Sequence, residues 1–124
     1  MPHQRLAKFG WIPDLPDHRD EKFTALARGS RPAKVDLRDQ MPGIYNQGDL
    51  GCCTAAATAA ACVYLDMLKG KAEWDPSLIF LYYNTRAIEG AIRMDRGAQI
   101  RNAIKAAVEY GICPAGLCPF DPTR

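Results

Sequence analysis

The chain has 124 residues, of which 48% are apolar and 24% are charged, a composition typical of one globular domain. Its formal charge of +2 is too small, and its basic residues are too dispersed, for the basic surface that nucleic-acid-binding proteins use. The longest strongly apolar run, residues 78–83, is far shorter than the roughly 20 residues of a membrane-spanning helix. We therefore expect neither nucleic acid nor a membrane as a partner.

Cysteine usage indicates reducing surroundings. Five cysteines are an odd number, and the adjacent Cys52 and Cys53 cannot easily bridge each other, so a complete disulfide framework is not expected. A local disulfide between Cys113 and Cys118 stays open. Reduced thiols, together with the absence of an apolar export segment near the N-terminus, predict a cytoplasmic location.

Residues 1–34, called the arm below, have the composition of an extension. Prolines at 13, 16 and 32 and a charge run at 17–22 predict irregular structure, with one turn of helix near Phe23. Trp11 and Ile12 are apolar enough to dock the arm onto a neighbouring surface. Residues 35–51 are rich in glycine, proline and asparagine, which predicts a loop that folds back on itself.

The first predicted helix spans residues 53–69 and ends at Gly70, a common C-terminal signal. Its first half consists mostly of alanine, which has a high helix propensity and almost no side chain. Such a helix lets other backbone approach closely, so we expect it in a central, enclosed position. Cys62 is about half a turn out of phase with Cys53 and is expected in the core.

Two further helices are predicted. The first opens with Asp75 as its N-cap and Pro76 at the first helical position, and runs to about residue 89. The second, over residues 100–110, has the apolar spacing of an amphipathic helix and ends at Gly111. Residues 111–124 are proline-rich and predict a loop. The apolar stripe of the second helix, expected to face the core, comprises Ile100, Ala103, Ile104, Ala107 and Val108.

The sequence NQGDLGCCTA, residues 46–55, brings a thiol to the start of the first helix. Free N–H groups and the helix dipole stabilise negative charge there, which favours Cys53 as a nucleophilic thiolate. An attacked carbonyl also needs hydrogen-bond donors for its developing oxyanion. The side-chain amide of Gln47 and the backbone N–H of Cys53 can supply them, because Gly48 and Gly51 let the loop bring the two together.

These residues resemble the papain-like cysteine peptidases. In that family a Q-G-x-x-G-x-C run opens the long central helix, as it does here, and VDLR at 35–38 resembles the start of the mature enzymes. The segments DPSLIFLYYNTR, DRGAQIRNAIKAAVEYG and GICPAGLCPFD resemble the bacterial members, in the order in which those members show them. The resemblance covers residues 35–124.

The resemblance implies a mainly α fold. Residues 35–124 would form the N-terminal, left-hand helical lobe of the α+β papain-like fold, with three helices, and the C-terminal lobe would be absent. The arm, residues 1–34, would be an N-terminal extension that stands where the family has its pro-segment.

The resemblance also implies site residues. Cys53 would be the nucleophile of peptide-bond hydrolysis, and Gln47 would stabilise the oxyanion. Asp95, Gly97 and Ala98 match the segment whose backbone binds an extended polypeptide substrate. Neither a metal nor another cofactor is expected.

Three positions depart from the family pattern. Leu50 stands where disulfide-bearing members have a cysteine, so that bridge is absent. Cys52 replaces the usual serine, and Thr54 replaces the tryptophan that commonly follows the nucleophile. The first two changes fit a reduced, bacterial-type member, and the third alters packing beside the site without removing chemistry.

Length separates this chain from an intact peptidase. The family's catalytic histidine and asparagine lie about 130 to 150 residues after the cysteine, whereas 71 residues, 54–124, follow Cys53. His3 and His18 both precede Cys53 and do not match the family pattern, and His18 is interpreted as solvated. We therefore expect a truncated peptidase lobe, inactive alone, whose partner is the missing C-terminal lobe.

Two alternatives stay open. A non-catalytic module could hold an extended peptide or a partner lobe through the exposed face of the central helix, and the cysteines could serve a thiol redox or metal role. A zinc site that joins Cys113 and Cys118 to Cys52 and Cys53 is not expected, because no histidine is positioned to help. Three aromatic side chains are interpreted as packing residues: Trp74, Tyr82 and Tyr83.

Overall fold

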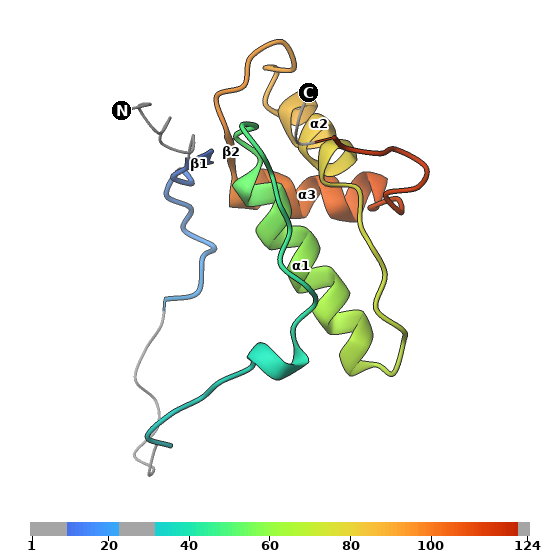
Figure 1. Ribbon diagram of the computed structural model, residues 1–124. Coiled ribbons are helices and arrows are strands. Elements are labelled where there is room, and N and C mark those ends of the chain that lie inside the picture. The colour runs from blue at the N-terminus through green and yellow to red at the C-terminus, as the bar shows by residue number, and fades with distance from the viewer. Residues whose placement is uncertain (1–9, 23–31, 122–124) are drawn as a thin grey trace, which may run out of the picture.

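A computed structural model describes residues 10–22 and 32–121. Figure 1 shows three helices that pack together, with the N-terminal segment at one side of them. The predicted mainly α lobe is confirmed, whereas the helical turn expected near Phe23 lies outside the described residues. The elements in chain order are β1 (Trp11–Ile12), the 3-10 helix η1 (Arg38–Gln40), α1 (Cys53–Leu68), α2 (Leu78–Ile88), β2 (Ala98–Gln99) and α3 (Ile100–Tyr110).

Helix α1 begins at Cys53 and ends at Leu68, with Lys69 as its C-cap, so the predicted helix is confirmed to within one residue. Its small side chains let α2 and α3 pack closely against one flank, where Ala55 and Ala59 are completely buried. The opposite flank is open, and Ala57 there is exposed. The enclosed position expected for this helix is therefore correct for one flank only.

Helix α2 begins later than predicted. The predicted start at Asp75–Pro76 is wrong, because α2 begins at Leu78 and the side chain of Ser77 caps it by accepting a hydrogen bond from Phe80 N–H. The proline instead forms an isolated antiparallel bridge with Pro114 in the C-terminal loop. Pairing with a distant segment thus extends the backbone just where the local sequence favours a helix.

Helix α3 has the predicted bounds, but only part of its apolar stripe faces the core. Ala103 is buried and Ala107 packs partly buried against the core, as expected, whereas the expectation is wrong for Ile104, 52% exposed, and Val108, 83% exposed. The completely buried side chains are Ala103 and Ala106, which are small enough for α3 to lie close to the other two helices. Close packing through alanines turns the larger apolar residues away from the core.

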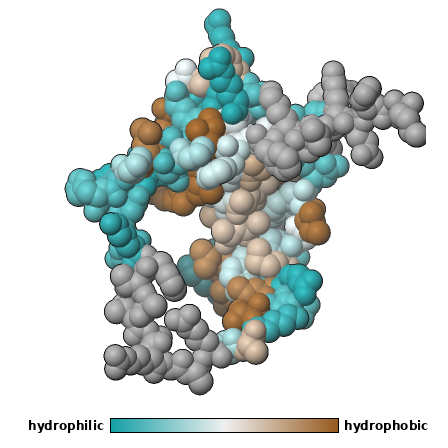
Figure 2. Space-filling model, turned by 90° about the vertical axis from the view of Figure 1, so that its left-hand side faces the viewer, coloured by the Kyte–Doolittle hydropathy of each residue, from teal (hydrophilic) through white to brown (hydrophobic). Residues whose placement is uncertain are grey.

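The exposed apolar residues of α3 border a surface groove of about 450 Å³, called the α1–α3 groove below. Cys62 lies in it half-buried, so its predicted place in the core is wrong. Figure 2, which views the side that carries the arm, shows apolar surface gathered down the middle of the molecule. The groove is lined by Ala57, Thr58, Ala61, Cys62 and Leu65 of α1 and by Ile100, Ile104, Ala107 and Val108 of α3.

The arm joins the helices through a short parallel sheet. Trp11 pairs with Ala98, and Ile12 pairs with Gln99. Because β2 leads directly into α3, this pairing fixes the arm against the start of that helix (Figure 1). The rest of the described arm is irregular, as predicted.

The core lies where the three helices meet. Its members come from α1, α2, α3 and β2, and Cys52, the residue before α1, is among them. None of the helices in the described part of the chain is long and apolar enough to cross a membrane. The buried core residues are Cys52, Ala55, Ala59, Leu78, Leu81, Tyr82, Ala98 and Ala106.

Candidate active site around Cys53

The two adjacent cysteines have different surroundings. Cys52 is completely buried, and desolvation raises the pKa of its thiol to about 11. Cys53 is the first residue of α1 and is half-buried, so its sulfur lies at the edge of the core. A buried, protonated thiol serves packing, whereas the thiol beside it is placed to meet another molecule.

The loop before α1 is stabilised by its own hydrogen bonds. Leu50 N–H donates to Gln47 O at 3.2 Å, and Cys52 N–H donates to Leu50 O at 2.8 Å. The side chain of Gln47 donates from Nε2 to Leu50 O at 2.8 Å. These bonds hold Gln47 in a tight turn against the loop that ends at Cys53.

The backbone of the arm lies on the sulfur. Gly10 N–H donates to Cys53 Sγ at 3.2 Å, and Gly10 O accepts from Ala98 N–H at 2.7 Å. One residue of extended chain therefore contacts both the predicted nucleophile and the predicted peptide-binding segment. Sequence reasoning predicted that the arm could dock, but it did not identify Gly10.

Three glycines make this approach possible. A Cβ added to Gly10 would lie 1.7 Å from Gly51 O, and a Cβ added to Gly97 would lie 2.2 Å from Gly10 O. Gly97 also has a φ of +82°, a conformation that L side chains rarely adopt. The backbones of the arm, the loop before Cys53 and the segment before β2 are thus stacked without room for side chains.

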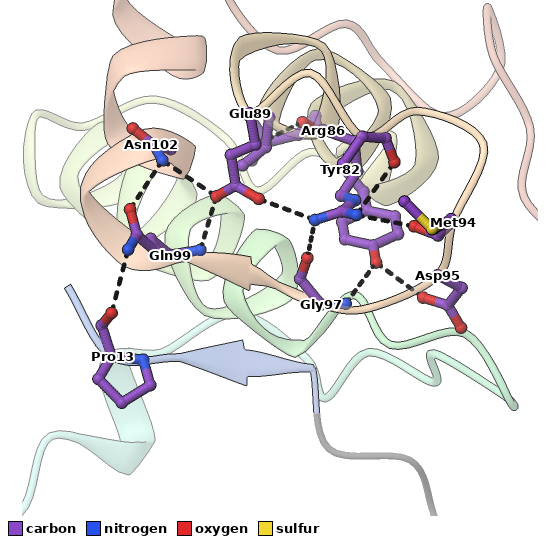
Figure 3. Close-up of polar contacts among 12 residues, drawn as sticks. Pro13, Tyr82, Arg86, Glu89, Met94, Asp95, Gly97, Gln99 and Asn102 are labelled. Carbon is purple, nitrogen blue, oxygen red and sulfur yellow. Dashed lines mark hydrogen bonds and ion pairs between the residues drawn. The ribbon is translucent and has the colours of Figure 1, made fainter. Parts of the chain in front are cut away.

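Asp95 uses its side chain at this site, whereas the sequence suggested a role for its backbone. Its carboxylate accepts from Gly51 N–H at 3.0 and 3.1 Å, and from the hydroxyl of Tyr82 at 2.7 Å. The same hydroxyl accepts from Gly97 N–H at 3.1 Å. Figure 3 shows Tyr82 between Asp95 and Gly97.

Tyr82 was expected only to pack. Its ring is buried, but its hydroxyl forms the bonds just described. Burial and the hydrogen bond to Asp95 raise the pKa of Tyr82 well above its usual value of 10.0. The hydroxyl therefore stays protonated and can donate to the carboxylate throughout the neutral range.

Arg86 and Glu89 complete the polar contacts of α2, and sequence reasoning missed both. The guanidinium of Arg86 donates to Gly97 O, to Met94 O at 2.8 Å and to Ala91 O at 3.0 Å. It also pairs with Glu89 at 2.8 Å, and Glu89 in turn accepts from Gln99 N–H at 2.9 Å (Figure 3). The i, i+4, i+7 spacing of Tyr82, Arg86 and Glu89 could have revealed this polar group from the sequence, since it places the three side chains on one face of α2.

Known proteins resemble the chain in sequence and structure. It is 34% identical to a peptidase C1-like protein of Acanthamoeba polyphaga mimivirus, over 94% of this chain and 43% of that protein. It is 38% identical to xylellain, a cysteine protease from Xylella fastidiosa, with a TM-score of 0.80 over 94% of this chain and 44% of xylellain. No protein-family model matches the chain.

The chain is related to the papain-like cysteine peptidases. It spans less than half the length of either relative, so the papain-like lobe described here corresponds to part of each. The resemblance noted in the sequence is thereby confirmed at the level of the family.

Polar contacts hold the arm along the papain-like lobe beyond Gly10. Gln99 Nε2 donates to Pro13 O at 3.1 Å, and the backbone N–H of Arg101 donates to Asp14 at 3.1 Å. The side chain of Arg101 binds Asp20 at 2.7 Å and lies 3.8 Å from Asp17. These contacts are exposed and follow the arm past the start of α3.

The remaining thiols of the papain-like lobe form no recognisable metal site. Within residues 10–22 and 32–121, no three histidine, cysteine or acidic side chains are grouped so that they could hold a metal ion. All five cysteines are free thiols. The side chain of His18 is 94% exposed, as its place in a charged segment suggested.

Proposed function

We propose that this lobe supplies the nucleophile of a thiol-dependent peptidase. Cys53 Sγ attacks the carbonyl carbon of a peptide bond, and the amide of Gln47 and the backbone N–H of Cys53 stabilise the oxyanion. The C–N bond then breaks, a histidine from outside residues 1–124 gives its proton to the leaving amine, and water hydrolyses the thioester. The contact of an extended backbone with both Cys53 and Ala98 supports this assignment best.

Residues 97–99 bind the substrate in this proposal. Ala98 N–H already donates to the carbonyl of an extended chain, and β2 pairs with that chain as a neighbouring strand. Main-chain bonds of this kind recognise an extended peptide whatever its side chains. Gly97 keeps the wall beside the sulfur flat, because it carries no side chain.

The arm, residues 1–34, acts as a pro-segment in this proposal. Its backbone occupies the place proposed for substrate, while its N–H makes a hydrogen bond to Cys53 Sγ. The group that contacts Cys53 Sγ is the N–H of Gly10 and not a carbonyl carbon, so the sulfur has no electrophile to attack there. The arm therefore excludes substrate without being cleaved.

The second lobe would cover the α1–α3 groove. The groove is almost entirely apolar, and its larger side chains, such as Ile104 and Val108, are exposed. Surfaces of this kind are typical of interfaces. The two relatives, each more than twice as long as their match to this chain, are consistent with a further lobe at this place. This lobe would bring the histidine and asparagine, so the 124 residues alone turn over substrate negligibly.

Reconstitution tests the proposal. The chain is co-expressed with the part of xylellain that this chain does not match, and cleavage of an unstructured protein is followed by mass spectrometry. We expect cleavage that disappears in Cys53→Ala and persists in the matched control Cys62→Ala. A folded pair that leaves the protein intact, or cleavage that survives Cys53→Ala, would contradict it.

A binding module is the second candidate. The exposed apolar groove and the strand edge at residues 98–99 can hold a partner without any reaction at Cys53. Peptide binding that is equal in the parent chain and in Cys53→Ala, with no cleavage by the reconstituted pair, would favour this candidate.

A further inference from the structure

The nucleophile loop is held from outside by one carboxylate. Both oxygens of Asp95 accept from Gly51 N–H, at 3.0 and 3.1 Å. Gly51 is buried and stands two residues before Cys53. A hydrogen bond to an ionised acceptor is about twice as strong as one between neutral groups, so this contact is a firm anchor for the loop.

The same carboxylate is linked to the substrate-binding wall. Tyr82 donates its hydroxyl proton to Asp95 at 2.7 Å and accepts from Gly97 N–H at 3.1 Å. Gly97 is buried and immediately precedes β2. The two loops, 44 residues apart in sequence, are thus joined by the Asp95 carboxylate on Gly51 N–H, and the Tyr82 hydroxyl fixes Asp95 and Gly97 of one loop to α2.

The link between the two loops consists of hydrogen bonds. Gly51 N–H donates to Asp95, and Tyr82 bonds both Asp95 and Gly97. All five thiols are free. Hydrogen bonds therefore connect the two walls of the site, in a form that reducing conditions do not break.

We propose that Asp95 and Tyr82 are positioning residues that set the location of Cys53 relative to the peptide-binding residues 97–99. Their chain of contacts, from Gly51 to Asp95, Tyr82 and Gly97, is called the two-loop clamp below. The inference rests on the proposed function, because the alignment of Cys53 with residues 97–99 matters only if a peptide bound there reacts with the sulfur. Neither side chain needs to touch the reacting atoms.

The clamp itself is tested by amide NMR of the full chain. Tyr82→Phe keeps the buried ring but removes the hydroxyl, so the amide of Gly97 loses its acceptor and Asp95 loses a donor. We expect hydrogen exchange at Gly97 to accelerate at least tenfold and the Gly51 resonance to shift. The matched control Tyr83→Phe, on the exposed neighbour, should change neither amide. Unchanged exchange at Gly97 in Tyr82→Phe would overturn the clamp.

The positioning role is tested by two alkylating reagents that react with Cys53, with every variant made in a Gly10→Ala background so that the arm does not cover the site. Iodoacetamide needs only access to the sulfur, whereas a peptidyl chloromethyl ketone must also bind along residues 97–99. The ratio of the two rates therefore reports the alignment of sulfur and strand, independently of how accessible the sulfur is. We expect the peptidyl-to-iodoacetamide ratio to fall at least tenfold in Tyr82→Phe and Asp95→Asn, and to hold in Tyr83→Phe and Asp49→Asn.

The outcomes separate the clamp from the proposed function. A ratio unchanged in both Tyr82→Phe and Asp95→Asn would overturn the positioning role, even if the amides respond. If the peptidyl reagent has no advantage over iodoacetamide in Gly10→Ala, whose arm is displaced, peptide binding at residues 97–99 fails, and the positioning role falls with it. The amide measurements still decide whether the clamp exists. Should Asp95→Asn not fold, Tyr82→Phe alone decides both points.

Discussion

Two segments border the site around Cys53, and they are held in opposite ways. Residues 91–99 are bonded from behind by the buried side chains of Tyr82 and Arg86 on α2. The arm is held by backbone pairing at Gly10 and by exposed ion pairs with Arg101. Exposed ion pairs stabilise little, whereas removal of one member of a buried network is costly. Residues 91–99 are therefore held by buried contacts, whereas the arm is held mainly by backbone pairing and exposed contacts.

The largest effect is expected from removing the Arg86 network that holds residues 91–99. Arg86→Ala leaves the carbonyl oxygens of three loop residues and the carboxylate of Glu89 without their donor in a buried setting. The free energy of unfolding should fall by about 3 to 5 kcal/mol. Denaturant titration measures it, with Arg93→Ala on the exposed part of the same loop as the control. Similar small losses for the two variants would show that the network does not hold residues 91–99.

The next largest effect is expected from displacing the arm at Gly10. Gly10→Ala places a Cβ against Gly51 O, where the backbone cannot yield without moving the arm. Overpacking costs about 1 to 3 kcal/mol, so iodoacetamide should alkylate Cys53 about tenfold faster once the arm is displaced. Peptide mapping by mass spectrometry assigns the modified thiol. Leu15→Ala, at an exposed arm position, is the control, and equal rates for both variants would mean that the arm does not cover the sulfur.

A smaller effect is expected at the α1–α3 groove, whose lining includes none of the described arm residues and none of residues 91–99. Val108→Ser replaces a side chain that is 83% exposed, so stability should change by no more than about 0.5 kcal/mol. Self-association of the chain, measured by sedimentation, should weaken because the apolar surface is reduced. Lys105→Ser, on the exposed surface of the same helix, should leave association as it is. Association that persists unchanged in Val108→Ser would locate the interface elsewhere.

The smallest effect is a pH dependence of the arm. A hydrogen bond from Arg19 holds the pKa of Asp17 below its usual value of 3.8, with a lesser contribution from Arg101. A lowered pKa means that the stabilising contribution is complete above the usual value and is lost as the pH falls below it. The Ala98 amide resonance, which reports pairing with Gly10, should therefore change below about pH 4, and less so in Asp17→Asn. The same acid response in both proteins would exclude Asp17 as its source.

Local signals in the sequence predicted where the helices lie better than they predicted which residues surround the helices. The start of α1 at Cys53 followed from the loop and the alanine run, and the end of α3 followed from Gly111. The start of α2 was predicted too early because the extended pairing of Pro76 depends on Pro114, which no local signal reveals. The stripe on α3 was assigned to the core because periodicity shows that a face is apolar, but not what covers it.

The candidate site was predicted in part, for a physical reason. The loop before Cys53 is contiguous in sequence, so its spacing could be read directly, whereas the clamp joins residues 44 positions apart. Tyr82 alone looks like any buried aromatic residue until the position of Asp95 is known. The contact of Gly10 with Cys53 likewise depends on the absence of side chains, which leaves no pattern in the arm.

The stacked glycines make the contact between the arm and Cys53 sensitive to mutation. Every base change that alters the amino acid encoded by a glycine codon adds a side chain, and at Gly10 and Gly97 that side chain would collide with backbone. A single amino-acid change at either of two codons is therefore enough to disturb the contact of Gly10 with the sulfur.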